Sequence, residues 1–323
     1  MSSILLEIKE KCAFVADNNA HVRVCYDQIA NYVDDLSAAD IMGLSAVWDT
    51  NWHYFADIEP TLSYMVALDC INFGSGYFST LKKREGETSG YVTVAMALKD
   101  RYVQKPITAR DFTNITAKDC ADIFDQDIDQ EDMLDLMGKF AGALQDMGTY
   151  IVQEYQGLFS AFIEAAEGSA DRLVGQIACI APFHDVSRYQ GQNIPIYKRA
   201  QILVGDLYTA FEGQGPGKFN DIHDLTIFAD NVVPHVLRYD GLLSYTDELA
   251  GRIDSGDYLL ADEDAEIALR ACSIHAAQKI IEEFRARGNQ DIYAMHLDHW
   301  LWHRGHEVAY TGKKRHHTKT TDY

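Results

Sequence analysis

Asp230 is the residue whose type and setting most directly suggest chemistry. It follows the apolar run 225–229, and Pro234 comes four residues later. We expect a helix that is capped by Asp221, continues through 225–229 and ends near Asp230. A short second helix should begin at Pro234, since proline favours the first turn of a helix. At such a corner the carboxylate can cap the backbone, or it can stabilise a developing positive charge or attack a carbon centre. Both interpretations stay open on the residues alone.

A second candidate group is positively charged. Lys198 and Arg199 place two adjacent positive charges in the stretch 195–240. They are either surface charges or anion binders. The segment 313–319 reads KKRHHTK and is basic in an acidic chain. It is either a frayed end or it folds back to supply a phosphate-binding site.

Two patterns resemble metal sites, but each lacks an essential ligand. Histidines share one side of a predicted C-terminal helix at 296, 299, 303 and 306. The carboxylate of an H-E-x-x-H zinc motif is missing there. The aspartates at 125, 127 and 129 lack the glycine and glutamate that a calcium loop requires. We therefore expect neither a metal nor a cofactor.

Charge and composition exclude several classes of partner. The 323 residues include 28 Lys and Arg against 49 Asp and Glu, a net charge of -21. Binding to long nucleic acids depends on many lysine and arginine contacts to phosphates, so we expect none here. A small basic pocket for one phosphate stays possible. We also expect no membrane segment and no signal peptide, because no apolar run approaches ~18 residues. The six cysteines are far apart, which is typical of a reduced cytoplasmic protein.

Apolar residues recur at helical spacing along most of the chain, which predicts an all-α fold. We expect helices over 4–16, 133–166, 196–211 and 264–286. The run 90–96 could be a short strand, and we expect loops over 73–90, 188–195 and 212–218. No linker divides the chain, so one multi-helix domain over 1–323, with room for two helical lobes, is the prediction.

Several long motifs resemble the queuosine salvage protein family. They are, in chain order, LDCINFGSGYF (68–78), GSADRLVGQI and FHDVSRYQG within 168–191, the run from IYKRAQ to GLLSY (196–245), AEIALRACSIHAAQKI (265–280), LDHWLW (297–302) and the tail HHTKTTDY. The resemblance implies an all-helical fold distantly like helix-hairpin-helix DNA glycosylases. It implies hydrolysis of the N-glycosidic bond of queuosine 5′-monophosphate to queuine and ribose 5-phosphate, for reuse of queuine in tRNA modification.

The resemblance also implies roles for particular residues. The family's FADxxVP motif falls on 228–234 and makes Asp230 the catalytic carboxylate. Its YKRAQ motif falls on 197–201 and makes Lys198 a catalytic-site residue that contacts phosphate or orients Asp230. The NF motif and its neighbours suggest that the base is bound by residues of the 72–75 loop and of the 197–206 region, namely Asn72, Phe73, Ser75, Tyr197 and Asp206.

The chain departs from the family pattern at a few positions. Asn231 and Val232 stand where many relatives have Tyr-Arg, and His235 stands where they have Gln, so Asn231 and His235 are expected to change details of base recognition. Lys319 replaces an arginine of the tail, which keeps the charge but not the forked geometry. The phosphate is expected at Arg199, His316 and Lys319.

Two functions from other classes compete with the hydrolase. One is a DNA or RNA base glycosylase, against which the net charge argues. The other is a queuine carrier that kept the pocket and lost the chemistry. The hydrolase is the preferred prediction, with a small nucleotide as its partner.

Overall fold

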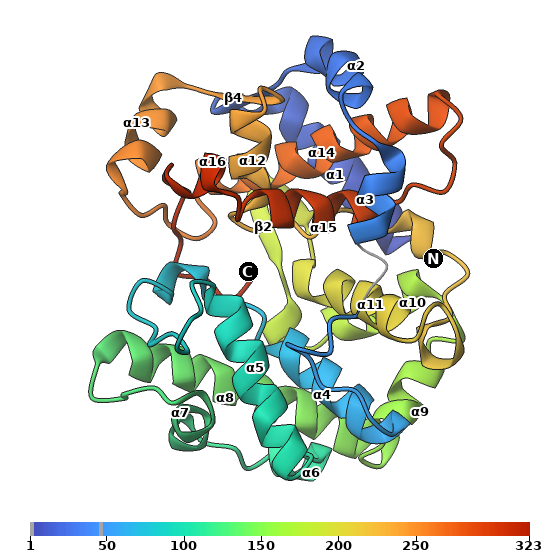
Figure 1. Cartoon of the computed structure of the whole chain (residues 1–323), viewed down its shortest axis with the longest axis vertical. Helices are drawn as coiled ribbons and strands as arrows, with labels where there is room; N and C mark the ends of the chain where they lie inside the picture. The colour runs from blue at the N-terminus through green and yellow to red at the C-terminus, as the bar shows by residue number, and fades with distance from the viewer. Residues whose placement is uncertain (1–2, 45–47) are drawn as a thin grey trace.

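The computed structural model describes residues 3–44 and 48–323 (Figure 1). Within these ranges it has sixteen α-helices and two small antiparallel sheets, so the all-α prediction is confirmed. The predictions of a single domain over 1–323 and of a likeness to helix-hairpin-helix DNA glycosylases stay predictions. Among the described helices, none combines the length and apolar character needed to cross a bilayer.

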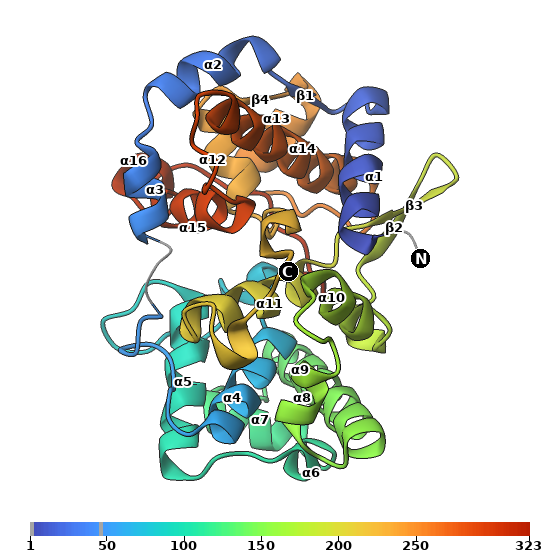
Figure 2. The same ribbon diagram turned by 90° about the vertical axis from the view of Figure 1, so that its right-hand side faces the viewer.

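The helices form two groups, one above the other in Figure 1. The upper group contains α1 (Ile4–Asn18), α2 (Tyr26–Asp34), α3 (Ala38–Leu44), α12 (Val233–Tyr239), α13 (Asp247–Ser255), α14 (Asp264–Ala286), α15 (Ala294–Arg304) and α16 (Val308–Thr311). The lower group contains α4 (Ile58–Cys70), α5 (Gly90–Gln104), α6 (Ala109–Phe112), α7 (Ala117–Phe124), α8 (Glu131–Tyr155) and α9 (Phe159–Glu164). Between them lie α10 (Ala170–Ala178) and α11 (Lys198–Ala210), as Figure 2 shows. Buried apolar side chains of both groups form one continuous core.

Two sheets of two strands complete the fold. In the first, β1 (Val22–Val24) pairs with β4 (Leu243–Tyr245), and in the second, β2 (Val186–Tyr189) pairs with β3 (Gln192–Pro195). The prediction of a loop over 188–195 was therefore wrong. Gln190 and Gly191 both have positive φ, at 45° and 80°. Positive φ at both central residues is the requirement of a tight hairpin turn, and Gln-Gly is not one of its common signatures.

Most helix predictions are confirmed, with local corrections. The expected helix over 133–166 is broken because Gln156 and Gly157 take positive φ, at 58° and 86°. The run 90–96 is the start of α5, whose first turn is capped by the Ser89 hydroxyl, and not a strand. Of the helix expected from Asp221 to Ala229, a 3₁₀ turn over Ile222–Asp224 forms, but residues 225–229 are not helical. Those residues are extended and buried, so Asp230 lies at the start of α12 rather than between two helices.

A buried ion pair joins the two candidate groups of the sequence. Arg270 of α14 is 1% exposed and donates to both carboxylate oxygens of Asp185, at 2.8 and 2.7 Å. The same Arg270 donates to the carbonyl of Ala229 at 3.1 Å, and Asp185 accepts the backbone N–H of Lys198 at 3.0 Å. The pair therefore fixes the residue before Asp230 and the first turn of α11 together.

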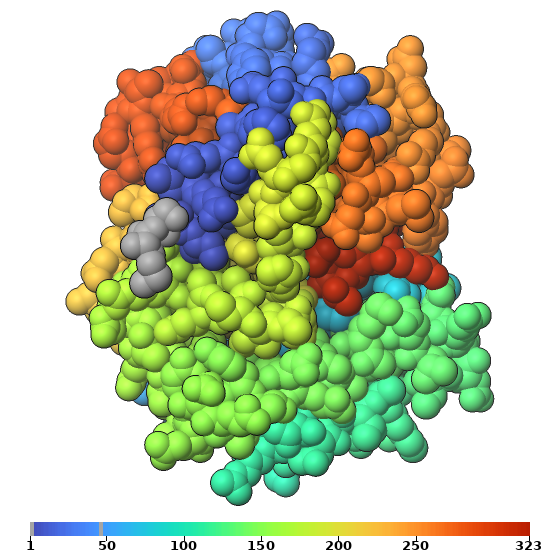
Figure 3. All heavy atoms as spheres, turned by 180° about the vertical axis from the view of Figure 1, so that it is seen from behind, coloured from blue at the N-terminus to red at the C-terminus, as the bar shows by residue number. Residues whose placement is uncertain are grey.

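The C-terminal segment folds back across the molecule. Its backbone approaches the 74–77 loop, where the N–H of Gly74 donates to the carbonyl of Tyr323 at 3.0 Å. His317 accepts the N–H of Leu259 at 2.9 Å. From behind, Figure 3 shows the red C-terminal atoms in a furrow between the orange and green halves. The segment is therefore folded back rather than frayed, and its role in phosphate binding stays a prediction.

Candidate active site

A cavity of about 900 Å³ lies between the two groups of helices. Its walls come from α4, α5 and the loop after α4 on one side, and from α12, α15 and the C-terminal segment on the other. Helix α11 adds Lys198, Ile202, Asp206 and Thr209. This volume lies within the range of small-molecule sites, ~300–1,000 Å³.

Seven of the residues predicted from the sequence line this cavity. They are Asn72, Phe73, Ser75, Lys198, Asp206, Asp230 and Asn231. Asn72 and Asn231, which are 159 positions apart in the chain, therefore meet at one cavity. The Asn231 amide donates to the carbonyl of His316 at 3.3 Å, which ties the start of α12 to the tail.

The structure does not bring Arg199 or Tyr197 to the cavity wall. Arg199 is 2% exposed and lies between the rings of Phe73 and Phe183, with 4.8 and 4.6 Å to their centroids. Its guanidinium donates to the carbonyls of Cys70 and Pro182. Arg199 thus supports the Phe73 ring from behind rather than facing the cavity, and its charge is neither exposed nor free to bind a phosphate.

Three further candidates also lie outside the lining. The His235 ring is buried and bonds to the carbonyl of Tyr310 at 3.1 Å. The His316 ring is buried against Tyr323. Lys319 pairs with Asp132 at 2.5 Å on the surface. Each of these side chains already has a partner elsewhere in the fold.

Asp230 is held firmly through one of its two oxygens. Its Oδ1 accepts the N–H groups of Val232 at 2.6 Å and Val233 at 3.1 Å, which caps the first turn of α12. Its Oδ2 accepts no hydrogen bond from the described residues. The capping and functional interpretations are therefore compatible, because one oxygen fixes the carboxylate and the other is left for a ligand.

Lys198 is buried among carboxylates. Its Nζ donates to the carbonyl and side-chain oxygens of Asn72, at 3.1 and 3.0 Å. Burial lowers the pKa of Lys198, and Asp230, then Asp69 and Asp298, oppose that shift by attraction. The surrounding acidic groups thus favour the charged form of Lys198, while burial disfavours it.

Asp298 of α15 is a site residue that the sequence did not reveal. It lines the cavity, and its Oδ1 accepts the N–H of Phe228 at 2.7 Å. Burial raises the pKa of Asp298 to about 7, and repulsion from Asp230 adds to the rise. A carboxyl that is neutral at slightly acid pH and charged at slightly basic pH therefore lies near Asp230. The LDHW run contains this residue but gives no sign of its burial.

Buried polar atoms without a partner among the described residues gather at the cavity. Four such atoms belong to its lining, namely Nε1 of Trp48, Oγ of Ser75, Oδ2 of Asp206 and Oγ1 of Thr209. Leaving a buried donor or acceptor unpaired costs ~1–3 kcal/mol. A polar ligand that satisfies them would recover that cost on binding.

Basic side chains also line the cavity. They are Lys83, Lys313, Lys314, Arg315 and His317. Burial lowers the pKa of Arg315 while attraction to Asp230 opposes this, and both residues line the cavity. Within residues 3–44 and 48–323, no cluster of three or more His, Cys, Asp or Glu has the arrangement of a metal site.

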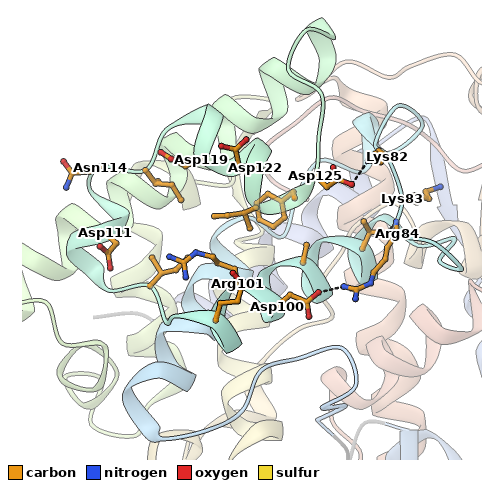
Figure 4. Close-up of a pocket in the computed structure, with 17 residues that line it drawn as sticks. Lys82, Lys83, Arg84, Asp100, Arg101, Asp111, Asn114, Asp119, Asp122 and Asp125 are labelled. Atoms are coloured by element: carbon orange, nitrogen blue, oxygen red, sulfur yellow. Dashed lines mark hydrogen bonds and ion pairs between the residues drawn. The ribbon is translucent and has the colours of Figure 1, made fainter.

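A second hollow, of about 690 Å³, lies between α5, α6 and α7 (Figure 4). It is lined by acidic residues on α7 and basic residues on the facing segment. Lys82 pairs with Asp125 at 2.5 Å, and Arg84 pairs with Asp100 at 2.6 Å. No buried orphaned side-chain atom identified in the described chain belongs to its lining. These two ion pairs already use several of its charged side chains.

Comparison with known proteins decides the family. A family model described as queuosine salvage protein matches residues 52–323. The chain belongs to this family. The matched region contains the residues named above as lining the cavity, except Trp48.

Individual relatives match over nearly their whole lengths. A protein of Sphaerobacter thermophilus is 30% identical over 96% of this chain and 95% of its own. One of Dictyostelium discoideum is 27% identical over 98% of each chain, and one of Mus musculus is 29% identical over 98% of this chain and 99% of its own. Each of the three is named queuosine 5′-phosphate N-glycosylase/hydrolase.

Proposed function

We propose that this member of the queuosine salvage family hydrolyses the N-glycosidic bond of queuosine 5′-phosphate, releasing queuine and ribose 5-phosphate. The observation that carries the proposal is Asp230, which lines the cavity and whose Oδ1 is fixed by two backbone N–H groups. The names of the relatives supply the substrate.

The chemistry of the base explains why such a carboxylate is needed. Queuine is a 7-deazaguanine and has no N7 that could be protonated to improve the leaving group. More of the barrier must then be lowered at the sugar, where positive charge develops as the bond breaks. A preorganised charged group is worth roughly 3–4 kcal/mol in a comparable electrostatic role. Asp230 fills that role with a negative charge.

The neighbouring residues take supporting roles in this proposal. Lys198 orients Asn72 through its two hydrogen bonds and balances the surrounding acids. Phe73 and Asn72 contact the base, with Ser75 and Asn231 as further polar contacts. The 5′-phosphate lies against the basic lining residues Lys83, Lys313, Lys314 and Arg315. The protein acts in the cytoplasm on a small nucleotide, without a cofactor or a long nucleic acid.

Incubation of the purified protein with queuosine 5′-phosphate, and separately with the nucleoside, tests the proposal. Free queuine and ribose 5-phosphate, detected by mass, are expected from the nucleotide. Tight binding of queuine without release from the nucleotide would show a carrier instead. Release of bases from a duplex, with binding that weakens steeply as salt rises, would show a nucleic-acid glycosylase.

A further inference from the structure

Helix α11 presents a stripe of three side chains to the cavity, in addition to Lys198. Ile202, Asp206 and Thr209 are spaced four and three residues apart, so they share one face of the helix. Asp206 is 6% exposed and Thr209 is 8% exposed. Oδ2 of Asp206 and Oγ1 of Thr209 have no hydrogen-bond partner within the described part of the chain. Two buried acceptors one turn apart therefore face the space that a ligand would fill.

The surroundings of Asp206 favour a cationic ligand. Burial raises the pKa of Asp206 well above its usual value, and repulsion from Asp69 and Asp298 adds to this while Lys198 opposes it. Asp69 is fully buried, and its Oδ2 also lacks a partner among residues 3–44 and 48–323. Two neighbouring buried carboxyls cannot both ionise cheaply. A cation beside Asp206 would remove that penalty, whereas a phosphate would increase it.

We propose that Asp206 and Thr209 bind the substituent at C7 of the base, Asp206 its ammonium group and Thr209 a hydroxyl. The proposal rests on the proposed function, because the substrate is the one named there. In queuine this substituent is an aminomethyl group joined to a cyclopentenediol. Its secondary amine carries a proton at neutral pH, and its diol offers donors and acceptors. A carboxylate and a hydroxyl one helical turn apart match this pair of groups.

Ile202 gives the same stripe an apolar part, which fits the cyclopentene ring between the amine and the helix. Tyr91 also lines this region, and Asp206 and then Asp69 raise the pKa of its hydroxyl beyond the effect of burial. That hydroxyl already bonds to the His53 ring at 2.9 Å. Among these side chains, Asp206 therefore has a carboxylate oxygen that can accept a hydrogen bond from the ligand.

Calorimetric titration with two free bases tests the subsite without requiring turnover. Queuine carries the substituent, whereas 7-deazaguanine has the same ring system without it. In Asp206→Asn, which keeps the shape of the side chain, we expect the Kd of queuine to rise by roughly 30-fold or more, as for truncation of a buried charge pair. The Kd of 7-deazaguanine should change by less than about 3-fold. Thr209→Val should weaken the binding of queuine but not of 7-deazaguanine. Thr209→Ser, which keeps the hydroxyl, should bind queuine as the wild type does.

If Asp206→Asn weakened the binding of queuine and 7-deazaguanine equally, the proposal would be overturned, since Asp206 would then contact the ring system or support the fold. An unchanged Kd for queuine would overturn it as well. The melting temperature of each variant shows whether it is folded. Because free bases are used, these outcomes are independent of whether the wild-type protein cleaves queuosine 5′-phosphate.

Discussion

The ammonium group of Lys198 donates to both oxygens of Asn72, at 3.1 Å to the backbone carbonyl and 3.0 Å to the side chain. The two residues are 126 positions apart and come from α11 and the loop after α4. The contact holds this loop, and with it Phe73, beside the carboxylates of the cavity. Lys198 therefore both connects α11 to this loop and interacts electrostatically with the nearby carboxylates.

Replacing Lys198 should therefore impair both binding and chemistry. In Lys198→Gln we expect kcat/KM for queuosine 5′-phosphate to fall roughly 10²-fold, the size expected for loss of one preorganised charge. The pKa of Asp69 and of Asp298 should rise further, because Lys198 lowers both. Steady-state kinetics measure the first effect. Lys279→Gln, which removes an exposed lysine paired with Glu282, is the control and should keep full activity.

Two substitutions of Asp230 should separate its capping of α12 from its role in catalysis. An asparagine keeps the Oδ1 acceptor for Val232 and Val233, so Asp230→Asn should fold normally while kcat falls about 10²- to 10³-fold. Asp230→Ala loses the cap too and should unfold about 1 kcal/mol more easily. Thermal melts and single-turnover kinetics on both variants check this. Near-normal turnover by Asp230→Asn would refute the assigned role.

Gly76 should tolerate no side chain, because the C-terminal segment crosses it closely. A Cβ there would lie 2.2 Å from the carbonyl oxygen of Thr318. Gly76→Ala should cost about 1–3 kcal/mol of stability, as overpacking does, and should raise KM by displacing the tail. Gly142→Ala is the matched control, since it lies in α8 with no atom within 4 Å of the new Cβ. The control should be stabilised by about 0.5–1 kcal/mol, and denaturant unfolding measures both.

Breaking the buried ion pair between Asp185 and Arg270 should strongly lower the free energy of unfolding. Asp185→Asn removes the nearer carboxylate from the buried Arg270 and leaves Glu266 at 3.8 Å. Removing one member of a buried pair costs about 3–5 kcal/mol. Asp254→Asn breaks an equally well-formed pair with Arg238 whose carboxylate is 50% exposed, and it should cost less than about 1 kcal/mol. Urea unfolding compares the two. Similar losses in both variants would contradict the importance assigned to the buried pair.

Stability should reach its maximum slightly below neutral pH. Burial lowers the pKa of His299 to about 4 and of His316 to about 3, so these rings bind fewer protons when folded. Their contribution to stability therefore grows as pH rises toward about 6.5. Burial raises the pKa of Asp298 and Glu266 to about 7, so their contribution is complete below the unfolded pKa and is lost as pH rises through 7.

Histidines with lowered pKa outnumber the carboxyls with raised pKa. The free energy of unfolding should therefore increase with pH below about pH 6.5, where the histidines titrate, and decrease with pH above it. Melting temperatures between pH 5 and pH 8 measure this. Asp298→Asn should flatten the decline between pH 6.5 and pH 8. A melting temperature that keeps rising to pH 8 would show that the buried carboxyls do not govern it.

The sequence predicted long helices well because their apolar residues repeat with the helical period. It failed where a conformation depends on distant partners. The run 225–229 is as apolar as a buried helix, but its extended backbone is fixed by Arg270 and Asp298 from α14 and α15. Neighbouring Lys198 and Arg199 could not be told apart, because only the fold turns one toward the cavity and the other between two phenylalanine rings.

The cavity walls come from segments that begin near residue 43 and end at Tyr323. A ligand that touches all of them can bind only a chain in which both helix groups have docked. Such a compound stabilises the native state by about 2.7 kcal/mol at one hundred times its Kd. Added queuine should thus rescue variants weakened in either half, acting as a chemical chaperone far from the damaged position.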